Sequence, residues 1–187
     1  MRSLTLLAVA LALAAACGDP LGLPQPSISN RIDTVSLYAL SGTPVTQPSA
    51  YVIPFRTVVR TDQSIDGFDF GFDIDTAGRA VLLPTGALRL GRASGIQLTT
   101  TPFDSILVAP TGRYQLDSAV VVDSNSVAIL HSRPLACSFG ISVVYYAKLH
   151  VLAIDTTSGP NGRRIDFEIL TDINCGYRGL EPGLPRR

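Results

Sequence analysis

A row of aspartates is the part of this 187-residue chain best suited to chemistry. Asp69, Asp73 and Asp75, preceded by Asp66, alternate with aromatic and apolar residues. Side chains two positions apart on a strand share a face and lie about 7 Å from each other. Carboxylate oxygens are the ligands that Ca²⁺ prefers. The three aspartates are therefore a weak candidate calcium site, although no EF-hand spacing or glycine-aspartate repeat accompanies them.

Two other interpretations use the same aspartates. Glycosidases need two carboxyl groups about 5 to 9.5 Å apart, but aspartates two apart on any strand meet that distance. The simpler interpretation is a strand face that contacts water, where the charges discourage pairing with other sheets. We favour this simpler interpretation, which predicts that Asp69, Asp73 and Asp75 are all exposed.

The remaining chemical groups form no known catalytic pattern. His131 and His150 lack the His-Glu-x-x-His spacing of a zinc site, and a metal site joining His131 to Cys137 would compete with a disulfide. The Gly-x-Ser-x-Gly nucleophile turn and the glycine-rich phosphate loops are also missing from the sequence. The sequence therefore predicts no catalytic residue, no cofactor and no enzyme activity.

The elements that position these residues are predicted to be strands almost throughout. β-Branched and aromatic residues fill the apolar segments, and Gly, Pro, Asn, Asp and Ser separate them. The predicted strands are Thr34–Leu40, Tyr51–Arg60, Gly67–Asp75, Arg79–Leu83, Ile96–Thr100, Ser105–Ala109, Ser118–Asp123, Val127–His131, Phe139–Ile154 and Arg164–Ile173.

Short strands at this spacing favour an all-β domain. We expect an antiparallel two-sheet sandwich, Ig-like or related, with a closed β-barrel as the alternative. The alternation over residues 68–75 places Phe68, Phe70, Phe72 and Ile74 on one buried face. The long segment Phe139–Ile154 is expected to pair with Arg164–Ile173 in a terminal hairpin.

The composition supports a single folded domain and excludes one class of partner. Hydrophobic residues make up 46% of the chain and charged residues 16%, which is enough apolar material for a core. The formal net charge is +0, so no long-range attraction to nucleic acid is expected.

The first twenty residues have the pattern of a secretory signal peptide. Arg2 is followed by an apolar run that only Thr5 interrupts, and small residues lead into Cys17. The run is roughly 13 residues, whereas a bilayer-spanning helix needs about 20. We therefore expect an exported protein, in which residues 1–16 form the signal peptide.

The sequence Ala14-Ala15-Ala16-Cys17, with Leu13 before it, resembles the lipobox of bacterial lipoprotein precursors. The resemblance implies that Cys17 becomes the lipidated N-terminus and anchors the chain to the cell envelope. The resemblance also implies the outer membrane instead of the inner one, because Gly18, and not an aspartate, follows the cysteine. The alternative is an ordinary leader cleaved near Ala16. No family resemblance is found for the remaining chain.

Further boundaries follow from the composition. Residues 17–30 are rich in Pro and Gly and are expected to form a tether, residues 31–177 the β domain, and residues 178–187 a flexible tail. With Cys17 lipidated, Cys137 and Cys175 remain as a pair in an oxidising compartment. We expect a disulfide between them that closes the open end of the terminal hairpin; free thiols or metal ligands are the alternative.

Three functions are compatible with these patterns. The first is a non-enzymatic, membrane-tethered module that binds or scaffolds an envelope protein, a glycan or the wall. The second is a β-barrel that carries a small apolar ligand across the periplasm, which predicts an apolar cavity. The third is a hydrolase, which predicts that Asp69, Asp73 or Asp75 converges with a second acid in a cleft. We favour the first.

Overall fold

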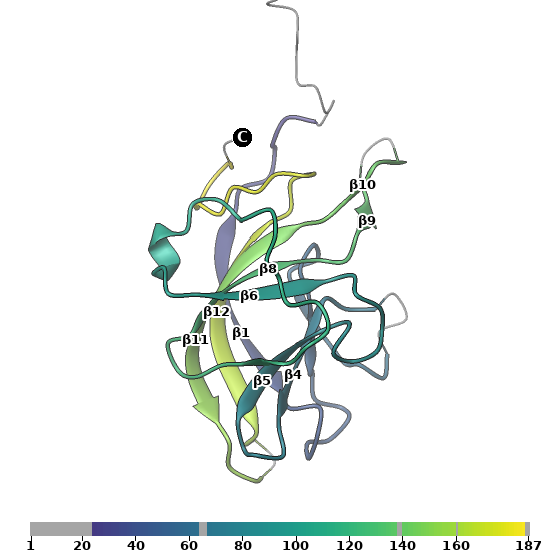
Figure 1. The fold of residues 1–187 in the computed structure, drawn as a ribbon, viewed down its shortest axis with the longest axis vertical. Helices are drawn as coiled ribbons and strands as arrows, with labels where there is room; N and C mark the ends of the chain where they lie inside the picture. Colours follow the sequence, from purple (N-terminus) through teal and green to yellow (C-terminus); the bar gives the residue numbers. More distant parts are fainter. Residues whose placement is uncertain (1–23, 64–66, 138–139, 160, 186–187) are drawn as a thin grey trace, which may run out of the picture.

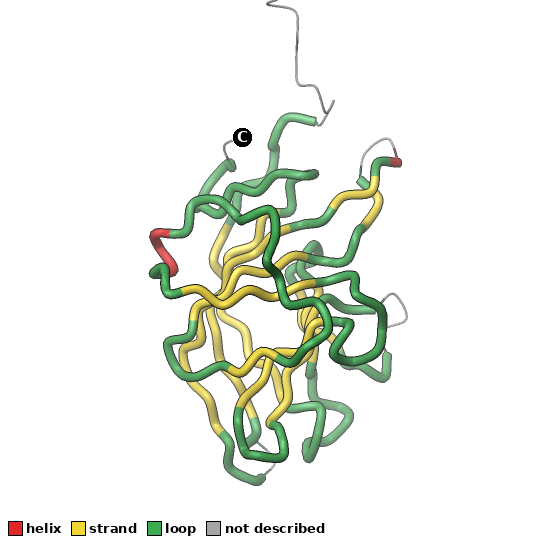
Figure 2. Tube along the Cα trace, viewed as in Figure 1, coloured by secondary structure: helices red, strands yellow, loops and turns green. Residues whose placement is uncertain are grey.

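The computed structural model describes residues 24–63, 67–137, 140–159 and 161–185 (Figure 1). Strands account for 41% of the described residues and helix for 3%; Figure 2 shows the strands and the short helix along the chain. The elements are β1 (Arg31–Tyr38), β2 (Ala50–Val52), β3 (Thr57–Val59), β4 (Phe70–Ile74), β5 (Ala80–Pro84), β6 (Gly95–Thr99), the 3₁₀ helix η1 (Phe103–Ser105), β7 (Val120–Val121), β8 (Val127–His131), β9 (Leu135–Ala136), β10 (Ser142–Val143), β11 (Tyr146–Asp155) and β12 (Arg164–Asp172).

The strands form two five-stranded antiparallel sheets. The first sheet has the order β1-β12-β11-β8-β6, and the second has the order β3-β2-β4-β5-β7. A separate two-stranded sheet joins β9 to β10. The outer strands of the two large sheets do not pair with each other, so the sheets are not closed into a barrel. The predicted sandwich is confirmed, and the barrel alternative is wrong.

The main core fills the space between the two sheets. Tyr51, Phe70 and Phe167 meet at its centre, with ring centroids 5.6 to 6.3 Å apart. Such tilted and edge-on ring pairs add to the stabilisation from burial. The alternation predicted for residues 68–75 is confirmed for Phe70, Phe72 and Ile74 of β4, which reach this core together with Ala147, Leu149 and Val151 of β11. Phe68, which was predicted on the same face, is buried in a separate cluster with Ala50 and Val52, because it lies before β4 begins.

The terminal hairpin pairs as predicted but is shorter. Tyr146 lies opposite Asp172, and the register shifts by one residue between Val151 and Ala153. The predicted strand Phe139–Ile154 is divided into β10 and β11, because residues 142–143 pair with β9 instead of β12.

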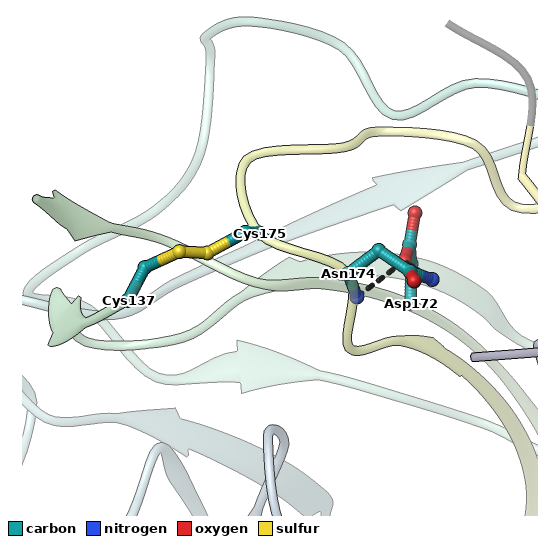
Figure 3. Close-up of a disulfide and its surroundings, with 4 residues drawn as sticks. All are labelled: Cys137, Asp172, Asn174 and Cys175. Atoms are coloured by element: carbon teal, nitrogen blue, oxygen red, sulfur yellow. Dashed lines mark hydrogen bonds between the residues drawn. A yellow bond between two sulfur atoms is a disulfide. The ribbon is translucent and has the colours of Figure 1, made fainter. Parts of the chain in front are cut away.

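The disulfide between Cys137 and Cys175 is confirmed, with the two Cα atoms 6.0 Å apart (Figure 3). Its position differs from the prediction. Cys137 follows β9 in the small β9–β10 hairpin, whereas the prediction placed it at the start of the long strand. The bond therefore ties this hairpin to the segment after β12. Beside it, the backbone N–H and the Nδ2 amide of Asn174 both donate to buried Asp172 (Figure 3).

A segment that we call the strap, residues 100–116, crosses the outer face of the first sheet and ends beside β6, where Gln115 exchanges backbone hydrogen bonds with Ile96. The strand predicted at Ser105–Ala109 does not form, and η1 with an irregular stretch takes its place. The strap and the sheet share a second apolar cluster, made of Phe103, Ile106, Ala109, Ile129, Leu170 and Leu180. The first sheet is thus covered on both faces.

The segment predicted to be a flexible tail is held in place over its described residues. Leu180 is fully buried in the second cluster. Its backbone N–H donates to the carbonyl of Leu107, and the N–H of Ala109 donates to Arg178. The prediction was wrong because Leu180 completes an apolar cluster whose other members are distant in the sequence.

Candidate functional site

A polar groove runs along the edge of the strap, on the outer face of the first sheet. It has a volume of about 540 Å³ and is lined by residues 99–104, residues 125–127, His150 and Glu168. The volume lies in the range of about 300 to 1,000 Å³ that is typical of ligand sites. Hydroxyl, amide, carboxyl and imidazole groups from four distant segments meet here, which makes the groove our candidate binding site.

His150 and Glu168 form the base of the groove. They face each other across β11 and β12 in the antiparallel register, and His150 Nδ1 lies 2.8 Å from Glu168 Oε1. Each side chain is about a quarter exposed. With the proton on Nδ1, the imidazole donates to Glu168 and its Nε2 is free to accept a hydrogen bond from a ligand.

Lys148 holds the wall of the groove in position. The lysine lies on the same face of β11 as His150 and is 1% exposed. Its Nζ donates to the carbonyl of Phe103 at 2.8 Å and to that of Ile106 at 3.1 Å, and lies 4.6 Å from the centre of the Phe103 ring. These contacts fix η1, which carries Asp104. Burial lowers the pKa of the Lys148 amine, although the charges of Asp104 and Glu168 oppose the shift.

The charges of the groove favour some ligands over others. Asp104 and Glu168 are acidic, and the described lining contains no arginine or lysine. An anion would meet carboxylates with no cation in the lining to compensate them. The groove therefore suits a hydroxyl-rich or cationic ligand better than a phosphate or a carboxylate.

The structure buries Asp69, which the alternation pattern predicted to be exposed. The N–H of Ile53 donates to this carboxylate at 2.7 Å, and the N–H and Nε of Arg133 donate at 2.9 and 3.1 Å. The prediction was wrong because Asp69 precedes β4, so the alternation of that strand does not govern it. Burial raises the pKa of the Asp69 carboxyl, and the donors from Arg133 and Ile53 oppose the shift.

Asp73 and Asp75 are each held by a different neighbour. Asp73 accepts from the N–H and the hydroxyl of Ser41. Asp75 closes the β4–β5 turn by accepting from the N–H groups of Ala77 and Arg79. The backbone and side-chain hydrogen bonds from Arg79 hold the pKa of Asp75 below its usual value.

Asp69, Asp73 and Asp75, the three candidate calcium ligands, therefore each form hydrogen bonds with different neighbours. In the part of the chain that the structure describes, no three His, Cys, Asp or Glu side chains gather in a way that would hold a metal ion. Asp66, the fourth residue of the row, lies outside the described residues.

His131 is packed into the outer face of the first sheet beside the strap. Its ring lies edge-on to Tyr114, with centroids 4.6 Å apart, and its Nδ1 is 3.0 Å from the carbonyl oxygen of Ser132. Burial lowers the pKa of His131, although the carbonyl of Ser132 and the charge of Asp69 oppose the shift.

This burial predicts a pH dependence of stability. The unfolded histidine takes up a proton near its ordinary pKa of about 6.5, and the folded one only at lower pH. His131 therefore makes the protein less stable as the pH falls below about 6.5. Urea unfolding at a series of pH values is expected to show a smaller loss of stability on acidification for His131→Gln than for the unchanged protein. Equal slopes in the two proteins would show that His131 is not the responsible group.

Part of this groove was accessible to sequence reasoning. The predicted pairing of Phe139–Ile154 with Arg164–Ile173 brings the strands of His150 and Glu168 together, and in the structure these two residues face each other. Asp104 and Asn125 were not identified, because they reach the groove only through the fold of the strap and of the turn before β8. The burial of Lys148 was also missed, since an isolated lysine on a strand is usually exposed.

No protein-family model matches the chain, and the comparison with curated proteins also finds no match. Cys17 and the predicted signal peptide lie outside the described residues. Among the residues that are described, no helix has the length and apolar content that a membrane crossing requires.

Proposed function

We propose that this chain is an exported lipoprotein that displays a non-enzymatic binding module at the cell envelope. Cys17 carries the lipid anchor, and the groove beside the strap binds a glycan of the envelope. Residues 18–26 form the tether, which is shorter than the predicted range of residues 17–30 because the N–H groups of Ser27 and Ile28 are bonded to Asn174 in the body. The signal-peptide pattern and the Ala-Ala-Ala-Cys sequence support the anchor. Several acyl chains at one cysteine would hold the protein durably without a transmembrane helix.

The convergence of polar groups in the groove is the observation that carries the binding part of the proposal. The threonine hydroxyls of residues 99–101 and the amide of Asn125 both donate and accept hydrogen bonds, whereas Asp104 and Glu168 accept them. Sugar hydroxyls also donate and accept, so the groove matches their chemistry. Envelope glycans with amino groups would gain further from the two carboxylates.

The position of the groove is compatible with a bound anchor. His150 and Glu168 pair in the middle of the β11–β12 hairpin. The anchor would join the body through residues 24–30, which lie at one end of the sandwich (Figure 1). A tethered domain would therefore leave the groove open to large ligands.

The other two functions have less support. The carrier of a small apolar ligand depended on a closed barrel and so loses its structural basis. The hydrolase depended on Asp69, Asp73 or Asp75 acting with a second acid, and the bonds to Arg133, Ser41 and Arg79 already occupy these carboxylates.

Titration of the ¹⁵N-labelled protein with neutral, amino-substituted and acidic oligosaccharides tests the binding. We expect a neutral or amino-substituted saccharide to shift the amide signals of residues 99–101, 103–104, 125–127, 150 and 168. Glu168→Gln and His150→Ala are each expected to weaken binding by roughly tenfold, because the first replaces a charged acceptor oxygen by an amide donor and the second removes the imidazole from the groove.

Asp155→Asn is the matched control, because Asp155 is an acidic residue of the same hairpin at its far end. This variant is expected to bind as the unchanged protein does. The proposal would be contradicted if no saccharide shifted the groove signals, or if a saccharide were chemically converted, since conversion would make the protein an enzyme.

A further inference from the structure

Three segments that are distant in the sequence lie side by side at one end of the sandwich. The N–H of Leu180 donates to the carbonyl of Leu107, so residues 178–180 run along the strap. Asn30 and Gly183 exchange backbone hydrogen bonds of 2.7 and 3.0 Å. Residues 27–30, 107–109 and 178–184 therefore form one continuous surface, at the end where the described chain begins (Figure 1).

This surface exposes large apolar side chains from each of the three segments. We call it the anchor-end patch, and its members are Ile28, 44% exposed, Leu107, 54%, Val108, 57%, and Leu184, 56%. Single exposed apolar residues are common, but a continuous group of them marks a surface that contacts another apolar body.

The tether limits what this surface can meet. The N–H groups of Ser27 and Ile28 both donate to Oδ1 of Asn174, at 2.9 and 3.0 Å, so the chain is fixed to the body from that point. Cys17 and Pro26 are nine positions apart in the sequence, and a fully extended chain covers at most about 30 Å over this distance. A lipid on Cys17 would hold this end of the body close to the bilayer.

We propose that the anchor-end patch rests on the lipid surface and orients the sandwich upright on the membrane. This proposal depends on the anchor at Cys17 but not on glycan binding. β1 runs from this end to the opposite one, where Arg163, just before β12, donates to the carbonyl of Ser41. The opposite end therefore points away from the membrane.

The contact is expected to be apolar instead of electrostatic. The formal net charge of the chain is +0, and Arg31, next to the patch, is paired with Asp33 at 3.1 Å. Binding driven by anionic lipid weakens as salt screens the charges, whereas apolar burial does not. Lipid contact of the patch should therefore persist at high ionic strength.

The absence of tryptophan from the chain makes a direct test possible. The processed chain that begins at Cys17 retains every described residue, and Cys137 and Cys175 are joined to each other. The thiol of Cys17 is coupled to a maleimide phospholipid in phosphatidylethanolamine–phosphatidylglycerol vesicles. This coupling supplies the anchor whether or not a cell lipidates the cysteine, so the result is independent of the proposed function.

Val108→Trp and Leu184→Trp place a fluorescent reporter in the patch. Val45→Trp is the matched control, because Val45 is 62% exposed and follows the far end of β1. We expect spin-labelled lipids to quench the two patch reporters several-fold more strongly than the control, at low and high salt. Equal quenching of all three, or no quenching at residues 108 and 184, would overturn the proposal.

Discussion

Replacing Cys137 and Cys175 together with serine is expected to lower the free energy of unfolding by about 4 kcal/mol. The two cysteines are 38 residues apart in the sequence. In the chain-entropy model, a cross-link over a loop of this length lowers the entropy of the unfolded chain, which raises its free energy by about 4 kcal/mol. Urea unfolding of the oxidised protein and of the double variant measures the difference.

Reduction provides the control for this prediction. Dithiothreitol is expected to destabilise the unchanged protein by nearly the same amount as the double substitution, and to have no effect on the double variant. A loss below about 1 kcal/mol in both experiments would show that the disulfide contributes little to stability, because a typical native disulfide contributes about 2 to 4 kcal/mol.

Asp69→Ala is expected to destabilise the protein by about 3 to 5 kcal/mol, the usual result of removing one partner of a buried ion pair. The substitution leaves the N–H of Ile53 and the N–H and Nε of Arg133 without their carboxylate acceptor. Of these groups, the N–H of Ile53 is fully buried with its residue. Thermal or urea unfolding measures the loss.

Two further variants test whether this loss of stability comes from the buried ion pair of Asp69 with Arg133. Asp69→Asn retains one acceptor oxygen and relieves the burial of a charge, so its loss should be smaller than that of Asp69→Ala. Asp73→Ala removes an aspartate of the same sequence row whose bonds to Ser41 are exposed, and its effect should be within about 1 kcal/mol. Equal losses for Asp69→Ala and Asp73→Ala would contradict the buried-pair explanation.

The parts of the fold that local patterns determine were predictable from the sequence. The alternation of aromatic residues with aspartates gave the buried face of β4 correctly, since the period of a strand is two residues. The pairing of β11 with β12 followed from two apolar segments separated by a short turn. The disulfide followed from the number of cysteines and from the expected compartment.

The failures involve residues whose state depends on distant partners. Asp69 is buried because Arg133 reaches it from the loop after β8. Lys148 is buried because the strap brings the carbonyls of Phe103 and Ile106 to it. Leu180 holds the last segment because the second cluster offers it an apolar site. No local pattern contains these contacts.

The candidate groove likewise combines residues that local patterns bring together with residues that only the tertiary fold brings together. One pair, His150 with Glu168, follows from the hairpin register, but the strap and the turn before β8 supply the other polar groups. Because the strap forms no regular strand, alternation says nothing about which of its side chains face the groove. The groove is therefore a consequence of the tertiary fold.

The mass of the N-terminal peptide, taken from the protein purified out of bacterial envelopes, tests the lipoprotein account most directly. The account predicts a chain that begins at Cys17 and carries a lipid on that residue, and predicts that Cys17→Ala abolishes this modification. A chain that begins at another residue, or one whose Cys17 retains an unmodified thiol, would contradict it.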